Sequence, residues 1–235
     1  MSLLIDILKD LNIDYDEEMV EKTEDFYRLL IEKNKVMNLT AITDHDDFMI
    51  RHIGDSLLSC RVISFGAEKV IDVGTGAGFP GIPLKIFFPA LDIVLLDSLK
   101  KRLLFLDEVI DKLCLQDIST IHGRAEDLGK DPSFRASFDL GVSRAVASLN
   151  VLSELTIPFI KKNGRFIYYK SSDIDEEFSS SLTAFRLLGA PEPSVSAVPL
   201  FDTGIIRKFV VSVKSENTPG KYPRKAGVPA KEPIM

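Results

Sequence analysis

Apolar side chains in the first part of the chain recur at intervals of three and four residues, the spacing of amphipathic helices. The pattern covers Leu3, Leu4, Ile7, Leu8 and Leu11, and again Phe26, Leu29, Leu30 and Met37. A last helix is expected over about residues 44–63, with Phe48, His52, Asp55 and Ser56 near one face. We therefore predict a helical N-terminal region over residues 1–65.

From Glu68 onward the pattern changes to short apolar runs that alternate with amphipathic stretches. The runs include KVIDV, LDIVLLD, ISTIHG, FDLGVSRAV and GRFIYYK. Strands separated by helices indicate an α/β fold with a largely parallel sheet that is covered on both faces. This core is predicted over residues 66–214.

The end of this core has a different pattern. The last two strand candidates, SVSAVPL and KFVVSVK, are joined only by FDTGIIR. A connection this short cannot make a parallel crossover, so the two strands are predicted to form an antiparallel hairpin. Residues 215–235, dense in Pro, Gly and Lys, are predicted to be an irregular basic tail.

The stretch VIDVGTGAGFPGIP, residues 70–83, places glycines directly after a strand, where the backbone turns sharply and a ligand can approach closely. Two registers fit it. Read from Gly76, the spacing G-A-G-F-P-G matches the dinucleotide fingerprint of NAD enzymes. Read from Val70, it places Asp72 at the strand end, then Gly74, Gly76 and Gly78, a pattern associated with S-adenosylmethionine. The second register uses every residue, whereas the first leaves residues 72–75 as an awkward extension of the strand.

Asp97 ends the next strand candidate, where a carboxylate can accept hydrogen bonds from ribose hydroxyls. This residue fits either ligand, and it could instead cap the following helix. The terminal hairpin distinguishes better between NAD and S-adenosylmethionine as the ligand, because the ordinary NAD-binding fold ends in parallel strands. It favours a methyltransferase.

Composition narrows the function classes further. Three histidines and two cysteines without a C-x-x-C motif predict no metal site, and no apolar run approaches the ~20 residues of a membrane span. We expect a cytoplasmic monomer. A net charge of -6 argues against wholesale electrostatic binding to nucleic acid, but residues 205–235 are locally basic and the first thirty residues are acidic.

Several motifs together resemble the bacterial ribosomal RNA small-subunit methyltransferase G family, also called glucose-inhibited division protein B. They are NLTAIT, RHIGDSL, VIDVGTGAGFPGIPLKI, LLDSLKKRLLFLDEV, HGRAEDLG, SRAVASLNVL and YPRKAGVPAKEPI. The resemblance runs from about Asn38 to Pro233. This sequence departs from the family at Gly54, where a larger residue is usual, and carries Thr75 where Ser is also common. The resemblance implies a Rossmann-like, seven-stranded class I core that methylates guanine N7 in small-subunit (16S) ribosomal RNA, on naked RNA or in a ribosomal particle.

The resemblance also implies a set of cofactor-binding residues for S-adenosylmethionine. Gly74, Gly76, Gly78 and Phe79 would line the cofactor with Asp72 and Asp97, and Ala125 and Glu126 would lie beside the adenine. Glu126 could instead be a first-turn acid that favours the helix dipole. Arg144, at the end of the fourth strand, could hold RNA phosphate, guanine or the cofactor carboxylate.

Guanine N7 carries a lone pair and no proton, so this chemistry needs positioning and no general base. The positioning candidates are Arg144 and Lys170. The predicted RNA-binding residues are Arg51, His52, Lys170, Lys221, Tyr222, Arg224 and Lys225. Two simpler interpretations compete: Arg51 and Asp55, four residues apart, could pair on a helix, and the tail could be merely solvated.

Other functions stay open at the level of the sequence. A methyltransferase of this fold could act on a protein or a small molecule, and the Gly76–Gly81 register allows an NAD-dependent oxidoreductase. A non-enzymatic RNA-binding assembly factor is disfavoured by the intact Asp72, glycines and Asp97.

Overall fold

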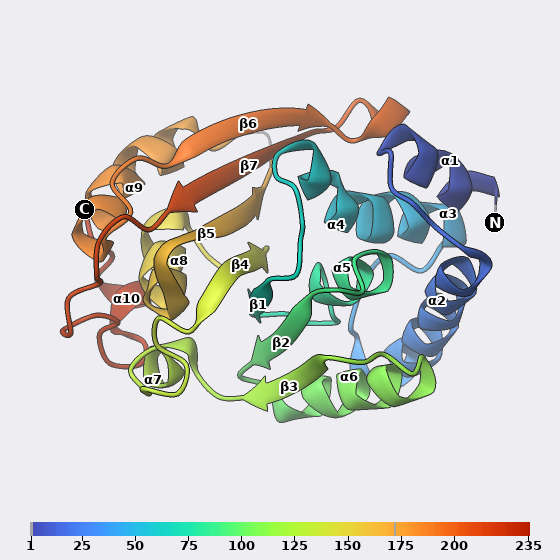
Figure 1. Ribbon diagram of the computed structural model, residues 1–235, viewed down its shortest axis with the longest axis horizontal. Helices are drawn as coiled ribbons and strands as arrows, with labels where there is room; N and C mark the ends of the chain where they lie inside the picture. The colour runs from blue at the N-terminus through green and yellow to red at the C-terminus, as the bar shows by residue number, and fades with distance from the viewer. Residues whose placement is uncertain (1, 172) are drawn as a thin grey trace.

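The computed structural model describes residues 2–171 and 173–235, and its strands form one seven-stranded sheet (Figure 1). The strands are β1 (Lys69–Val73), β2 (Asp92–Asp97), β3 (Ile118–His122), β4 (Phe138–Arg144), β5 (Ile160–Lys170), β6 (Ser194–Pro199) and β7 (Ile206–Val213). Their order is β3-β2-β1-β4-β5-β7-β6. The first five strands are parallel neighbours, and β7 is antiparallel to both β5 and β6. The predicted α/β class and largely parallel sheet are confirmed.

Helices lie on both sides of this sheet. They are α1 (Ser2–Asp10), α2 (Glu17–Met37), α3 (His45–Phe48), α4 (Asp55–Leu57), α5 (Gly81–Phe87), α6 (Lys100–Lys112), α7 (Ala125–Leu128), α8 (Leu149–Thr156), α9 (Asp175–Leu188) and α10 (Val228–Lys231). Figure 1 shows α1 to α6 on one side of the strands and α7 to α10 on the other.

Successive residues of the central strands enter different cores, as the two-residue period of a strand requires. Val70 and Ile93 pack in the apolar cluster that includes the N-terminal helices. Ile71 and Val94 pack in a second cluster with α8 and α9. Burial on both faces explains why these strands read as continuous apolar runs in the sequence.

The N-terminal helices share their core with the sheet. Phe26 of α2 and Phe48 of α3 are fully buried and lie against Phe79, with ring centroids 5.3 and 6.1 Å away. The helix predicted over residues 44–63 is helical throughout most of its length but changes type, passing from α3 through a π-helical turn over Met49–Gly54 to α4 and a 3₁₀ turn over Leu58–Arg61. Gly54 packs against Phe201, and a Cβ there would meet the Phe201 ring at 2.5 Å. This close approach accounts for the small residue at that position.

The predicted antiparallel hairpin is confirmed, with Ser194 opposite Val211 and Pro199 opposite Ile206. Its second strand, β7, lies between β5 and β6, so the hairpin joins the sheet through β7.

The C-terminal tail packs against the fold, and its predicted irregular course includes one helical turn, α10. Arg224 binds the fully buried carboxylate of Glu154 in α8 through its backbone N–H and its guanidinium, at 2.7 to 3.1 Å. Arg135 donates hydrogen bonds to the carbonyl oxygens of Thr218 and Tyr222. The tail is therefore an integral part of the surface beside α7 and α8.

Asp72 holds the turn between β1 and α5. Its side chain is fully buried, and Oδ2 accepts hydrogen bonds from the Thr75 hydroxyl at 2.7 Å and from the Gly81 N–H at 3.0 Å. Oδ1 has no hydrogen-bond partner among the described residues. Burial raises the pKa of Asp72 from 3.8 to about 7, against the opposing effect of the two hydrogen bonds.

This raised pKa predicts a pH-dependent stability. Between pH 4 and 7 the unfolded chain has lost the Asp72 proton while the folded chain retains it, so this residue makes stability fall as the pH rises. Asp72→Asn removes the titration. From pH 5 to pH 7.5, the unfolding free energy of the parent should fall by about 2 to 3 kcal/mol more than that of the variant, measured by urea denaturation. The solvent-exposed Asp92→Asn is the control, and identical pH profiles for Asp72→Asn and the parent would contradict the prediction.

Candidate functional site

A cleft of about 510 Å³ opens at the carboxyl ends of β1, β2 and β4. Within the sheet, β2 and β3 lie beyond one edge of β1, and β4 and β5 lie beyond its other edge, so the strand order changes direction at β1. Such a switch point is where open α/β sheets bind ligands. The predicted cofactor residues that line the cleft are Gly74, Gly76, Phe79, Asp97, Ala125, Glu126 and Arg144. Asp72 and Gly78 lie behind it, in the turn that shapes it.

The glycine turn forms the floor of this cleft. The φ angles are +76° at Gly74, +60° at Gly76 and +97° at Gly78, values that residues with a Cβ rarely adopt. At Gly76 an added Cβ would find no neighbour closer than the Gly74 carbonyl oxygen at 4.0 Å. Backbone at Gly76 is therefore left uncovered beside the cleft.

Asp97 ties this turn to the neighbouring strand. Its Oδ2 accepts the Gly76 N–H at 3.0 Å and lies 3.4 Å from the Arg102 guanidinium, while Oδ1 accepts the Leu99 N–H at 2.8 Å. The following helix α6 begins at Lys100. The Asp97 carboxylate thus holds the backbone just before α6 and also lines the cleft. Its side chain is only 4% exposed.

Ala125 and Glu126 form the start of α7 at the side of the cleft. The Glu126 Oε1 accepts the backbone N–H of Gly227 at 2.9 Å, which joins the cleft wall to the C-terminal tail. Glu126 is therefore bound to the tail as well as lining the cleft.

A second pocket of about 470 Å³ adjoins the cleft, with His52, Arg144 and Ala145 lining both. Its other lining residues come from the N-terminal region and from β5, α9 and β7; they are Ile42, Arg51, Asp55, Tyr169, Lys170, Ser171, Glu177 and Arg207. The two spaces therefore share a wall that contains Arg144.

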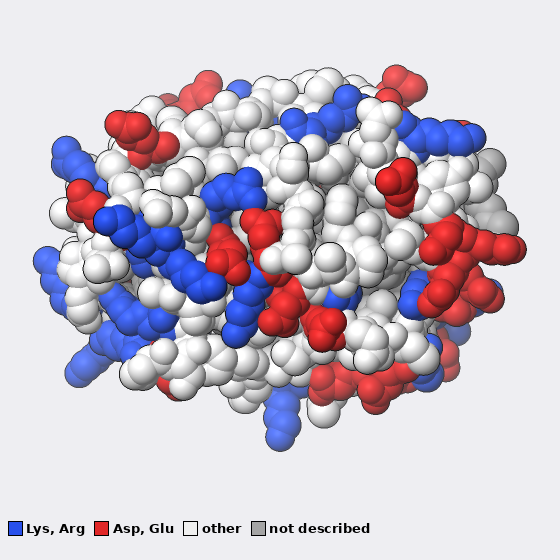
Figure 2. Space-filling view, viewed as in Figure 1, with Lys and Arg blue, Asp and Glu red and all other residues white. Residues whose placement is uncertain are grey.

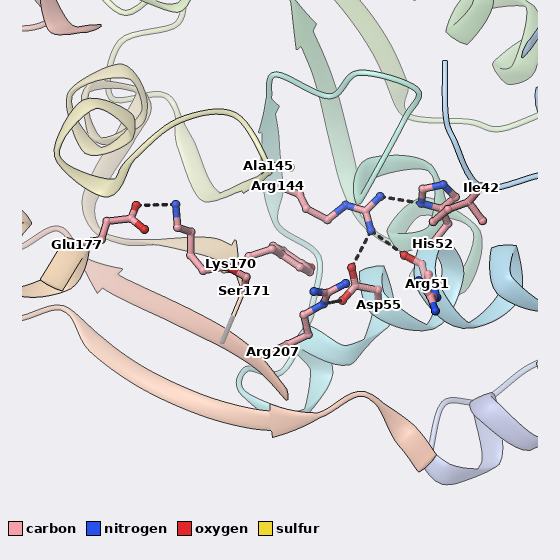
Figure 3. Close-up of a pocket in the computed structure, with 11 residues that line it drawn as sticks. Ile42, Arg51, His52, Asp55, Arg144, Ala145, Lys170, Ser171, Glu177 and Arg207 are labelled. Atoms are coloured by element: carbon pink, nitrogen blue, oxygen red, sulfur yellow. Dashed lines mark hydrogen bonds and ion pairs between the residues drawn. The ribbon is translucent and has the colours of Figure 1, made fainter. Parts of the chain in front are cut away.

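Arg144 is held in this shared wall by a network that Figure 3 shows. Its Nη1 donates to Asp55 Oδ2 at 2.9 Å and to the Arg51 carbonyl oxygen at 3.2 Å. The other Asp55 oxygen accepts from Arg207 Nε at 2.6 Å. The interpretation of Arg51 and Asp55 as a helical pair is wrong, because Arg51 pairs with Asp47 at 2.9 Å and the buried Asp55 takes the two arginines from the sheet.

His52 is held neutral in the same wall. Arg144 Nη2 lies 3.1 Å from His52 Nδ1, and because a guanidinium only donates, Nδ1 accepts and the proton is on Nε2. Nε2 then donates to the Thr40 hydroxyl at 2.8 Å. Burial and the Arg144 charge lower the pKa of His52 from 6.5 to about 3. The ring stacks on Phe79 at 4.2 Å, and Arg144 lies 5.0 Å from the same Phe79 ring.

Lys170 lies in the second pocket and is largely buried. Its Nζ pairs with Glu177 Oε1 at 2.6 Å and donates to the Ala147 carbonyl oxygen at 3.0 Å. Tyr169 beside it is buried; its hydroxyl donates to the Ser56 carbonyl oxygen at 2.9 Å and lies 2.7 Å from Ser59 Oγ, as expected of a core tyrosine.

The four predicted RNA-binding residues of the tail lie in different surroundings. Tyr222 is buried in the apolar core, and Arg224 binds Glu154. Lys221 and Lys225 are exposed. On the face of the molecule drawn in Figure 2, Lys and Arg side chains gather on the left, where Figure 1 places α7 and the tail. Acidic side chains gather on the right of the same face, beside the N-terminal helices.

Three residues of the site were not identified from the sequence: Thr40, Glu177 and Arg207. Thr40 lies within the NLTAIT motif, which could have directed attention to it. Glu177 and Arg207 have no local signal, since their partners Lys170 and Asp55 are brought to them only by the fold.

In residues 2–171 and 173–235, no group of three or more His, Cys, Asp or Glu side chains is arranged to hold a metal ion. In the same part of the chain, no helix combines the length and apolar character needed to cross a membrane.

Comparison with known proteins identifies the family. The family model described as rRNA small subunit methyltransferase G matches residues 19–201. Ribosomal RNA small subunit methyltransferase G of Thermoanaerobacter sp. (strain X514) is 46% identical over 100% of this chain and 98% of its own length. That of Acetivibrio thermocellus is 45% identical over 99% and 96%.

A solved structure shares the fold at low identity. A predicted O-methyltransferase, Atu636 from Agrobacterium tumefaciens, is 13% identical over 69% of this chain and 81% of its own, with a TM-score of 0.55. The sheet order with an antiparallel β7 is that of class I S-adenosylmethionine-dependent methyltransferases. The chain belongs to the rRNA small subunit methyltransferase G family.

Proposed function

We propose that this protein transfers a methyl group from S-adenosylmethionine to N7 of a guanine in small-subunit ribosomal RNA. The observation that carries the proposal is the pair of adjoining spaces, one above the glycine turn and one walled by basic side chains, which share His52 and Arg144. Together with the family, this arrangement favours the S-adenosylmethionine register of the glycine stretch over the NAD register.

The residues of the cleft fit an adenosyl ligand. The open backbone at Gly76 allows close approach, Phe79 supplies an apolar face, and Asp97 offers carboxylate lone pairs to ribose hydroxyls. Ala125 and Glu126, which line the same cleft, are the proposed contacts of the adenine. When bound, S-adenosylmethionine supplies a sulfonium methyl group, whose bond to sulfur breaks as the bond to N7 forms, with the electron pair returning to sulfur and no proton released.

The protein groups of the second pocket suit a target that needs no base. His52 is neutral and its Nδ1 lone pair is engaged by Arg144. Asp55 is paired with two arginines, and Glu177 with Lys170. Positioning is a contribution that these residues can make without a base, and alignment of reacting atoms alone can lower a barrier by about 7 kcal/mol or more.

The guanine must leave a regular helix to reach this site, because side chains cannot read N7 in the deep, narrow major groove of A-form RNA. We therefore expect a target in a loop, a distorted segment or a flipped state.

Methyl-labelled S-adenosylmethionine, incubated with small ribosomal subunits that lack the modification, tests the proposal. We expect the label to be recovered as N7-methylguanosine after digestion of the RNA. Cofactor binding without this nucleoside among the products would refute it. Comparison of naked RNA with assembled subunits in the same assay identifies the preferred substrate.

Gly76→Val should weaken S-adenosylmethionine binding by about tenfold or more, measured by calorimetry. A branched side chain at this position strains a left-handed backbone and fills the approach to the ligand. Gly66→Val is the control, since a Cβ at Gly66 has nothing within 4 Å and its φ lies outside the left-handed region. Unchanged affinity in Gly76→Val would remove the turn from the cofactor site.

The exposed lysines of the tail are proposed RNA contacts. Replacing Lys221 and Lys225 together by Gln should weaken RNA binding and lower the slope of its salt dependence by about 1.5, with S-adenosylmethionine affinity unchanged. Arg224 is left intact because it neutralises buried Glu154. Lys9→Gln with Lys35→Gln, which removes two exposed charges from α1 and α2, is the matched control. Equal salt slopes for the tail variant and the parent would exclude the tail from the RNA site.

A further inference from the structure

Lys170 and Glu177 form an ion pair on the side of the second pocket away from His52 (Figure 3). Lys170 is the last residue of β5, and Glu177 lies in the first turn of α9. Their side chains are 13% and 25% exposed. The pair is therefore partly shielded from water and accessible to a ligand in the pocket.

Each partner retains hydrogen-bonding capacity. Both contacts of the Glu177 carboxylate with described residues fall on Oε1, which accepts the Leu149 N–H at 2.6 Å and pairs with Lys170. Oε2 is left to accept from a ligand. The Lys170 ammonium has three N–H donors, of which Ala147 and Glu177 engage two. A donor and a carboxylate acceptor thus lie side by side at this wall.

This pairing is complementary to the edge of guanine opposite N7. Guanine presents the acceptor O6 next to the donors N1–H and N2–H. Adenine presents a donor, N6–H, next to the acceptor N1, and would meet repulsion at both positions. A ring whose O6, N1 and N2 face this wall turns N7 away from it, toward the Arg144 wall shared with the cofactor cleft.

We infer that Lys170 and Glu177 select guanine at this pocket, with Lys170 donating to O6 and Glu177 accepting from N1–H and N2–H. The inference rests on the proposed function and assigns the base-recognising residues of that site. It assigns recognition of the base to Lys170 and Glu177 and not to Arg144, whose guanidinium is already engaged by Asp55 and His52.

The carboxylate has a second effect during the reaction. Transfer of the methyl cation to N7 leaves a positive charge that is delocalised over the guanine ring. A negative group fixed at N1–H and N2–H stabilises that charge more in the transition state than in the neutral base. Glu177 therefore contributes to the rate of methyl transfer as well as to the choice of base.

Glu177→Gln tests the inference with little disturbance to the fold, because the amide oxygen can still accept the Leu149 N–H. We expect the single-turnover rate of methyl transfer to small ribosomal subunits to fall about 100-fold, with S-adenosylmethionine affinity within twofold of the parent. Glu176→Gln, the exposed neighbour in the same helical turn, removes the same charge and should react at the parental rate.

Substitution of inosine for the modified guanosine, once the parent enzyme has mapped it, gives a readout that a structural role would not change. Inosine lacks the N2 amino group. The parent should prefer guanosine by about tenfold, and Glu177→Gln should lose most of this preference.

The outcomes separate the two proposals. Absence of N7-methylguanosine with the parent refutes the proposed function itself. Formation of N7-methylguanosine by the parent, with equal rates and equal guanosine preference in Glu177→Gln, refutes only the base-recognition role. A parallel loss of S-adenosylmethionine affinity in Glu177→Gln would also refute it, since the residue would then support the whole site.

Discussion

The carboxylate of Asp55 joins three segments that are far apart in the sequence. It lies near the end of the N-terminal helical region and binds Arg144 from β4 and Arg207 from β7, with its side chain only 4% exposed. A buried carboxylate without partners costs several kcal/mol, and so does a guanidinium left in the same place. The three groups are therefore stable in this position only together. Since Arg144 lines both the cleft and the second pocket, the shape of the shared wall depends on this charge balance.

The same network explains why the N-terminal helices belong to the site. Arg144 fixes the Nε2–H tautomer of His52, and Thr40 receives that proton in a hydrogen bond. His52 in turn stacks on Phe79, which follows the glycine turn. A side chain at the end of β4 is thus held by residues that precede β1, and the glycine turn is packed against them. The fold positions both pockets through one set of contacts.

The parts of this arrangement that follow local rules could be predicted from the sequence. Continuous apolar strands, the seven-residue link FDTGIIR between two late strands and an acid before spaced glycines each constrain their own neighbourhood. The sheet, the hairpin and the glycine turn of the structure agree with them. The family motifs extended the prediction to Arg144, and Lys170 was predicted from its place at the end of the fifth strand candidate.

The pairing of charges did not follow local rules. The four-residue spacing of Arg51 and Asp55 pointed to a helical pair, yet Asp55 binds Arg207, 152 residues away. An exposed helical pair gains well under 1 kcal/mol, whereas a buried carboxylate requires buried cations, so burial decides the partner. Arg224 is a similar case, because nothing near it in the sequence reveals that Glu154 is fully buried.

The contact between Glu126 and Gly227 links the cleft wall to the tail. The tail is held in turn by Arg224, whose guanidinium binds the buried carboxylate of Glu154 in α8. Loss of this ion pair would release the segment that carries the Gly227 N–H, and Glu126 would lose its hydrogen-bond partner. The cleft wall at Glu126 therefore depends on a buried charge pair that lies outside the cleft.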